Sequence, residues 1–260
     1  MSGPISRIAQ AVSEGKSSPT KTVTRALQNI ESSNPTLNYM AQHCPEAALE
    51  AAANHSAIGP LAGVPVLVKD LEQVIGLPTR KGSLALSDAP PEKVDGTVVA
   101  RLKAAGAIVV GKTTLPEFAI EGYTANRATG VTHNPWNLEL SPGGSSGGSA
   151  AAISAGVVPI ATATDGGGSI RIPAAFCGLV GLKPSNGVIG RWPTQDWIDF
   201  STEGPFTTTV SDLRLLMSVI AGAVNGDPIG EVGVRPQDYL NFQNQRSIAH
   251  YLEPMSPRIL

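Results

Sequence analysis

The segment Ser141–Ser149 reads Ser-Pro-Gly-Gly-Ser-Ser-Gly-Gly-Ser, and Thr164–Pro173 reads Thr-Asp-Gly-Gly-Gly-Ser-Ile-Arg-Ile-Pro. Glycine weakens both helices and strands, so this much glycine indicates a segment whose backbone must adopt an unusual conformation or contact a ligand. Glycines beside serines free amide N–H groups to point into a pocket, and they leave the hydroxyl groups uncrowded. This combination suits an oxyanion site beside a nucleophile.

Apolar segments with helix or strand patterning surround both clusters. We predict helices at Ile5–Glu14, Pro19–Ser32 with Ser18 as its N-cap, Pro45–Asn54, Thr97–Ala105, Ser149–Ala155 and Ser211–Ala221 with Ser211 as its cap, and a helical turn at Pro173–Phe176. We predict strands at Leu37–Ala41, Val64–Val68, Ala107–Val110, Val157–Thr164 and Leu179–Leu182. Alternation of strands and helices predicts a layered α/β fold.

The composition limits the partners of the chain. It has 260 residues, 42% hydrophobic residues and a net charge of −2, which argues against a nucleic-acid surface and supplies no basic stripe for a membrane. No segment approaches the roughly 20 apolar residues of a membrane helix, and Met1–Ala11 lacks the apolar core of a signal peptide. The two cysteines, Cys44 and Cys177, are expected to be reduced packing residues, which favours a cytoplasmic protein.

Two segments match the sequence patterns of known catalytic or binding motifs, but their neighbouring residues do not fit the structures that those motifs require. Gly106–Thr113 fits the phosphate-loop pattern G-x-x-x-x-G-K-[ST], but its middle residues Ala-Ile-Val-Val form a strand rather than a polar turn. Gly143–Gly147 fits the nucleophile elbow G-x-S-x-G, but no core strand precedes it and only His250 follows it. A flexible Gly/Ser linker is the remaining simple interpretation, and it is weakened because the run passes directly into an apolar helix.

Lys69 completes a third arrangement. It ends an apolar strand, and burial lowers the pKa of a lysine, so Lys69 can act as a neutral base. Ser169 follows three glycines after a buried strand, and the amides of Gly166, Gly167, Gly168 and Ser169 can form a nest around a carbonyl oxygen. Taken alone, Lys69 reads as a strand-end lysine paired with Asp70. With both serine clusters, acyl transfer is the better interpretation.

Four stretches together resemble the amidase signature family. They are Gly63–Asp70, Pro142–Ser149, Asp165–Pro173 and Phe176–Ser185, and the likeness runs from about Ala51 to Ala221. The resemblance implies a single domain over 1–260, with a mixed sheet covered by helices on both faces. Members of the family run to well over 400 residues, so it also implies that the C-terminal portion of the fold is incomplete here.

The resemblance also implies a Ser–cisSer–Lys triad. Ser169 is the implied nucleophile, Ser145 the bridging serine after a cis peptide bond from Gly144, and Lys69 the final base. Ser146, Asp165 and Arg171 are the implied supporting residues. This chain has Gly166 where family members usually carry a larger residue, so the loop is expected to be less rigid.

The function implied is hydrolysis of a linear carboxylic amide to a carboxylate and ammonia or an amine, with no cofactor and no metal. A homo-oligomer is also considered, because a truncated sheet would expose strand edges that favour self-association. Two alternatives stand beside this function. One is the glutaminase subunit of a tRNA-dependent amidotransferase, which is disfavoured because Asp196–Pro205 reads Asp-Trp-Ile-Asp-Phe-Ser-Thr-Glu-Gly-Pro instead of resembling Ser-Leu-Asp-Gln-Ile-Gly-Pro. The other is a truncated, non-catalytic chain.

Overall fold

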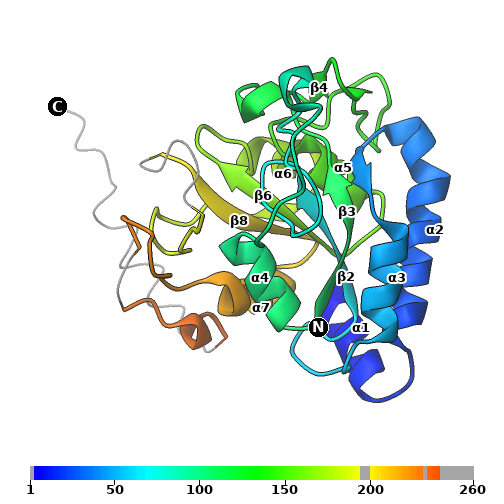
Figure 1. Ribbon diagram of the computed structural model, residues 1–260, viewed down its shortest axis with the longest axis vertical. Coiled ribbons are helices and arrows are strands. Elements are labelled where there is room, and N and C mark those ends of the chain that lie inside the picture. The colour runs from blue at the N-terminus through cyan, green and yellow to red at the C-terminus, as the bar shows by residue number, and fades with distance from the viewer. Residues whose placement is uncertain (1–2, 194–199, 231–232, 241–260) are drawn as a thin grey trace.

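The computed structural model describes residues 3–193, 200–230 and 233–240 (Figure 1). The strands of its main sheet are β1 (Met40–His43), β2 (Val64–Lys69), β3 (Ala107–Thr113), β6 (Ile160–Asp165), β7 (Val180–Gly181) and β8 (Thr202–Thr207). The helices are α1 (Pro4–Ser13), α2 (Pro19–Leu37), α3 (Pro45–Ala53), α4 (Thr97–Ala104), α5 (Gly147–Ser154), α6 (Arg171–Cys177) and α7 (Val210–Ile220).

Shorter elements lie in the connections. They are the 3₁₀ turns η1 (Leu84–Leu86), η2 (Glu117–Ala119) and η3 (Pro236–Tyr239), and a separate ribbon of β4 (Ala125–Asn126) and β5 (Gly130–Val131). Within the described ranges, no helix combines the length and the apolar character needed to cross a membrane.

The six-stranded sheet has the order β1-β3-β2-β6-β8-β7 and is mixed. Its centre is parallel, because β2 pairs in parallel with β3 and β6, and the outer strands β1, β8 and β7 pair antiparallel. Parallel strands end at one edge of a sheet, so Lys69 and Asp165, the last residues of β2 and β6, share an edge. The register Asp165↔Thr202 places the start of β8 at that same edge.

Helices cover both faces of the sheet, as predicted (Figure 1). One hydrophobic cluster joins α2, α3, α5 and α6 to side chains such as Leu67 and Ala161. A second cluster joins α1, α4 and α7 to Val64 and Val66. The alternation of β2 side chains between the two clusters is the period-two pattern of a strand buried on both faces.

The second helix is longer than predicted. Ser18 caps it as expected, accepting a hydrogen bond from the Lys21 amide at 3.1 Å. The helix then continues past Pro35 to Leu37, because the buried Ile30 and Leu37 pack into the core, and it ends at Asn38 in the left-handed conformation. The strand expected at Leu37–Ala41 therefore begins only at Met40.

Other boundaries differ at the ends of elements. The predicted strand at Ala107 continues to Thr113, which confirms that the phosphate-loop match is part of a strand. The helix expected from Ser149 begins at Gly147, and the strand expected from Val157 begins at Ile160. Thr209, rather than Ser211, caps α7 by accepting from the Asp212 amide.

Strand β8 was not predicted from the sequence. Its interior holds Gly204 and Pro205, two residues that disfavour strands in isolation. The tertiary structure explains the glycine, since a Cβ there would lie 2.3 Å from the Leu182 carbonyl oxygen. The strand thus depends on a close backbone approach that no local pattern reveals.

Candidate active site

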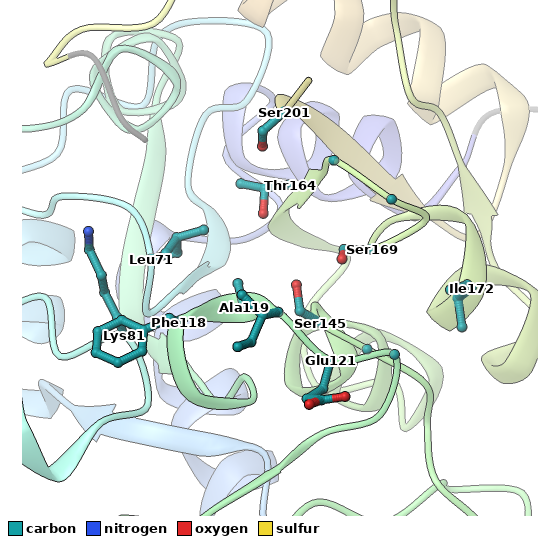
Figure 2. Close-up of a pocket in the computed structure, with 15 residues that line it drawn as sticks. Leu71, Lys81, Phe118, Ala119, Glu121, Ser145, Thr164, Ser169, Ile172 and Ser201 are labelled. Atoms are coloured by element: carbon teal, nitrogen blue, oxygen red, sulfur yellow. The ribbon is translucent and has the colours of Figure 1, made fainter. Parts of the chain in front are cut away.

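A pocket of about 340 Å³ opens at the edge where β2 and β6 end. Both glycine–serine clusters contribute to its lining, through Ser145 from one and through Gly166, Gly167 and Ser169 from the other. Figure 2 shows the Ser145 side chain directed toward the part of the pocket where Ser169 lies, with Thr164 on the adjoining strand. Two segments that are distant in sequence therefore face one cavity.

Lys69 lies beneath this pocket and is fully buried. Its Nζ atom makes three hydrogen bonds to hydroxyl groups, to Ser145 Oγ at 2.8 Å, to Ser146 Oγ at 2.9 Å and to Thr164 Oγ1 at 2.8 Å. Burial lowers the pKa of Lys69 to about 7, against the opposing influence of Glu72 and Asp165. Near neutral pH a substantial fraction of this amine is therefore uncharged.

The alternative partner for Lys69 considered from the sequence is wrong. Asp70 pairs instead with Lys112, whose Nζ lies 2.8 Å from Asp70 Oδ1, and both side chains are buried. Lys112 is the lysine of the false phosphate-loop match, and in the structure it neutralises a buried carboxylate directly after the neighbouring strand β2.

The Gly144–Ser145 peptide bond is cis, as the family resemblance implies. Only glycine fits at Gly144, because a Cβ would lie 2.3 Å from the carbonyl oxygen of Tyr123. The next residue, Ser146, ties the two clusters together, since its amide donates to the Ser169 carbonyl at 3.3 Å. A backbone hydrogen bond thus joins the first glycine–serine cluster to the second.

Asp165 organises the loop that carries Ser169. Its carboxylate accepts from the amides of Gly168, Ile170 and Arg171 at 2.7, 3.1 and 3.3 Å, and from the Arg171 guanidinium at 2.9 Å through both Nε and Nη2. These hydrogen bonds hold the pKa of Asp165 below its usual value, although burial opposes them. Asp165 and Arg171 thus hold the backbone of this loop through hydrogen bonds, and their support of catalysis stays a prediction.

One expected oxyanion donor points elsewhere. The Gly168 amide donates to Asp165, so its hydrogen is not directed at the pocket. Gly166 and Gly167 line the pocket and are exposed to it. Of the four amides expected to form the nest, that of Gly168 is engaged by Asp165, so the prediction now concerns the amides of Gly166, Gly167 and Ser169.

Sequence reasoning missed two threonines of β6. Thr164 accepts from Lys69 Nζ, and Thr162 accepts from the Lys69 amide at 2.9 Å. A signal was present in the sequence, since the buried strand reads Ile-Ala-Thr-Ala-Thr-Asp and places both hydroxyls on one face. Without the register against β2, nothing in the sequence connects them to Lys69.

The opposite wall of the pocket comes from η2 and the residues after it. Phe118, Ala119 and Ile120 line it, and Phe118 and Ala119 both adopt the left-handed conformation, with φ of 52° and 61°. Figure 2 shows Phe118 and Ala119 on the side of the pocket away from Ser169. Phe118, Ala119 and Ile120 give this wall an apolar part, and Glu121 follows them in the lining.

Comparison with known proteins agrees with this geometry. The amidase family model matches residues 21–250. The chain belongs to the amidase signature family. Family membership accounts for the pattern of four sequence stretches and for the arrangement of the strands around the pocket.

Relatives of this amidase-family chain include enzymes of two kinds. It is 40% identical over 230 residues to an acylamidase of Rhodococcus erythropolis, covering 85% of this chain and 48% of the relative. It is 48% identical over 188 residues to a glutamyl-tRNA(Gln) amidotransferase subunit of Carboxydothermus hydrogenoformans, covering 72% of this chain and 38% of the relative. The chain thus spans about half the length, or less, of these relatives.

Solved structures show the same relationship. The 6-aminohexanoate cyclic dimer hydrolase superposes with a TM-score of 0.84 at 35% identity, over 89% of this chain and 49% of that enzyme. The amidase-signature fold is therefore present in this chain over about half the length of the full enzyme.

Proposed function

We propose that this chain carries the catalytic centre of a serine amidase, which hydrolyses a linear carboxylic amide to a carboxylate and ammonia or an amine. One observation carries the proposal: a buried lysine with a lowered pKa contacts Ser145 beside a pocket that also holds Ser169. This is the arrangement that a serine–lysine acyl-transfer centre requires.

The contacts of Lys69 support a role as base. A neutral amine has two N–H groups and one lone pair, so it can donate to two of its three hydroxyl neighbours and accept from the third. When Ser146 and Thr164 accept the two N–H groups, the lone pair faces the Ser145 hydroxyl. In this assignment Ser145 passes a proton to Lys69 while it takes one from Ser169.

The reaction then follows in two halves. Ser169 Oγ attacks the amide carbon, its proton moves through Ser145 to Lys69 Nζ, and the amides of Gly166 and Gly167 receive the developing oxyanion. When the C–N bond breaks, the proton returns through Ser145 to the leaving nitrogen, and an acyl ester remains on Ser169. Water attacks this ester by the same proton route and releases the carboxylate.

The glutaminase alternative is kept because amidotransferase subunits are among the relatives. The sequence comparison that disfavours it used Asp196–Pro205, of which residues 196–199 lie outside the described residues. Glu203 and Gly204 of this segment lie in β8. A glutamine-specific activity that requires a partner protein would select this alternative, whereas release of ammonia from simple amides by the chain alone favours the amidase.

The remaining sequence-based proposals concern the whole protein. A single domain over 1–260 is supported by a six-stranded sheet that includes every described strand except those of the β4–β5 ribbon. A cytoplasmic location is supported by Cys44 and Cys177, which are both free thiols. Formation of a homo-oligomer stays a prediction, and gel filtration coupled to light scattering measures the oligomeric state.

Labelling by a fluorophosphonate followed by peptide mass spectrometry tests the proposal. We expect an adduct on Ser169, no adduct in Ser169→Ala, and labelling slowed by about 100-fold or more in Lys69→Ala, because a general base is lost. Ser154→Ala serves as the control, since it removes a hydroxyl group on α5 that donates to the Cys177 carbonyl. Equal labelling of wild type and Lys69→Ala would remove lysine from the mechanism.

A further inference from the structure

A second cavity, of about 320 Å³, opens at the edge of the sheet that also holds the proposed catalytic pocket. Asp70 and Thr114, which directly follow β2 and β3, line this cavity together with Arg80 and with Thr129 from the loop between β4 and β5. No described residue lines both cavities, and Lys81, the neighbour of Arg80, lines the catalytic pocket. The second cavity is therefore a separate place where a ligand can bind.

Arg80 brings a positive charge without a counter-charge to this second cavity. Its side chain is half-buried, and within the described ranges no residue accepts a hydrogen bond from its guanidinium group or forms an ion pair with it. Its Nε atom is buried and has no hydrogen-bond partner. Because buried polar atoms are almost always hydrogen-bonded, this guanidinium group is suited to an acceptor that comes from outside the chain.

The carboxylates around the second cavity have partners other than Arg80. Asp70 lines the cavity, but its Oδ1 atom lies 2.8 Å from Lys112 Nζ, so the two buried charges cancel each other. Glu117 accepts a hydrogen bond from the Ser83 hydroxyl at 2.5 Å, does not line the cavity and forms no ion pair with Arg80. The net charge of the lining is therefore the positive charge of Arg80.

The rest of the lining combines a hydroxyl group with apolar side chains. Ser87 is exposed, and its hydroxyl makes no hydrogen bond with another described residue, so it can donate to a ligand. Leu84, Leu115 and Ala128 are apolar, and Leu115 is fully buried. A ligand that matches this lining has an anionic end and a short apolar part.

We propose that the second cavity binds a small monocarboxylate with a short apolar tail, whose carboxylate group accepts hydrogen bonds from the guanidinium of Arg80. The planar guanidinium offers two parallel N–H groups, which match the two oxygens of a carboxylate. The single net charge of the lining and the neighbouring carboxylate of Asp70 favour a monoanion over a dianion, because like charges repel. The inference does not depend on the proposed function, since no lining residue of the catalytic pocket takes part.

Titration of the isotopically labelled chain with sodium butyrate at constant ionic strength tests the proposal, with NMR shifts of backbone amides as the readout. We expect saturable shifts at Ser83, Leu84 and Thr129, while the amides of Gly166 and Gly167 report separately on the catalytic pocket. Butan-1-ol keeps the tail without the charge and should bind about tenfold more weakly or worse. Sodium sulfate keeps negative charge without the tail, and the lost apolar burial should weaken it by about tenfold as well.

Variants of Arg80 assign the binding to this side chain. Arg80→Gln removes the charge and should weaken butyrate binding about tenfold or more, because charge-assisted hydrogen bonds are lost. Arg80→Lys keeps the charge without the planar fork and should retain part of the affinity. Arg127→Gln is the matched control, because Arg127 is an exposed arginine between the lining residues Asn126 and Ala128 and does not itself line the cavity. Thermal unfolding without ligand verifies that each variant is folded.

Several outcomes would overturn the inference. One is the absence of saturable shifts in the wild type, and another is an unchanged affinity for butyrate in folded Arg80→Gln or an equal loss in Arg127→Gln. Tighter binding of sulfate than of butyrate would indicate a site for an inorganic oxyanion instead. Shifts confined to Gly166 and Gly167 would place butyrate in the catalytic pocket. Absence of Ser169 labelling, in contrast, rejects the proposed function and leaves this inference standing.

Discussion

At the scale of single residues, the proposed chemistry depends on how hydroxyl groups hold a buried lysine. Three hydroxyl groups surround Lys69 Nζ within 2.9 Å, and burial lowers the pKa of the amine to about 7. The hydroxyls can accept N–H groups from the neutral amine or from the ammonium. They therefore orient the nitrogen in both protonation states without selecting one by charge.

Thr164→Val tests this orientation. The substitution keeps the shape of the side chain and removes one of the acceptors of Lys69 Nζ. We expect kcat to fall about tenfold, equivalent to about 1.4 kcal/mol, with a smaller change in KM. Steady-state hydrolysis of an amide measures it, and Thr208→Val, an exposed threonine after β8, is the control. A tenfold change in KM alone would assign Thr164 to substrate binding instead.

Asp165→Asn and Arg171→Gln separate two parts of the loop that carries Ser169. Asp165 is buried and collects three backbone amides, whereas the Arg171 side chain is 57% exposed. We expect Asp165→Asn to lower the free energy of unfolding by about 2–3 kcal/mol, since a charged acceptor is lost. Arg171→Gln should cost less than about 1 kcal/mol, as for an exposed ion pair.

Urea denaturation of both variants measures the difference. Similar losses for the two substitutions would mean that the guanidinium, rather than the backbone amides, dominates the stability of the loop.

At the scale of elements, β2 and β3 are joined by more than their backbone ladder. The strands pair in parallel, and the buried pair of Asp70 and Lys112 connects the end of β2 to β3. Gln42 on β1 also donates to Asp70 at 2.8 Å, so three adjacent strands share one buried carboxylate. This network fixes the turn after β2 and, through it, the position of Lys69.

Lys112→Met tests the network. It leaves Asp70 buried without its cation, so we expect a loss of about 3–5 kcal/mol in the free energy of unfolding. The double variant Asp70→Leu/Lys112→Met removes both charges and should recover much of that loss. Chemical denaturation of the two variants provides the comparison, and additive losses would show that the two side chains are not coupled.

At the scale of the whole molecule, the sheet gathers buried ionisable groups at one edge and makes stability depend on pH. The pKa of Lys69 falls from 10.5 to about 7 on folding, so between pH 7 and 10.5 the unfolded chain binds the proton that the folded chain lacks. Linkage then requires that the contribution of Lys69 to stability increases as the pH rises through this window.

Comparison with Lys69→Met tests this dependence. The free energy of unfolding of the wild type minus that of the variant should increase from about pH 7 to about pH 10 and level off above about 10.5. Urea unfolding at a series of pH values measures both proteins under identical conditions. A difference that stays flat across the window would show that Lys69 keeps its proton in the folded protein.

Many residues of the candidate site could be predicted because they lie in short, recognisable stretches of sequence. The glycine–serine clusters and the strand-end lysine were recognised from local patterns, whereas the roles of Ser145, Asp165 and Arg171 were implied by the family resemblance. The structure places Ser145 and Ser169 at one pocket, with Lys69 in contact with Ser145. The layered α/β fold could likewise be predicted from periodicity. Boundaries were less accurate, as for α2, whose end is decided by packing of Leu37.

The sequence by itself determined which residue types meet at this edge and the order of the elements that carry them, since both follow from local propensity and spacing. Only the tertiary structure decided which side chains and which strands pair with one another. Thr164 is 95 positions from Lys69, Lys112 takes Asp70, and β8 enters the sheet through a glycine contact. Such pairings depend on strand order and register, which long-range burial of side chains selects and no local stretch encodes.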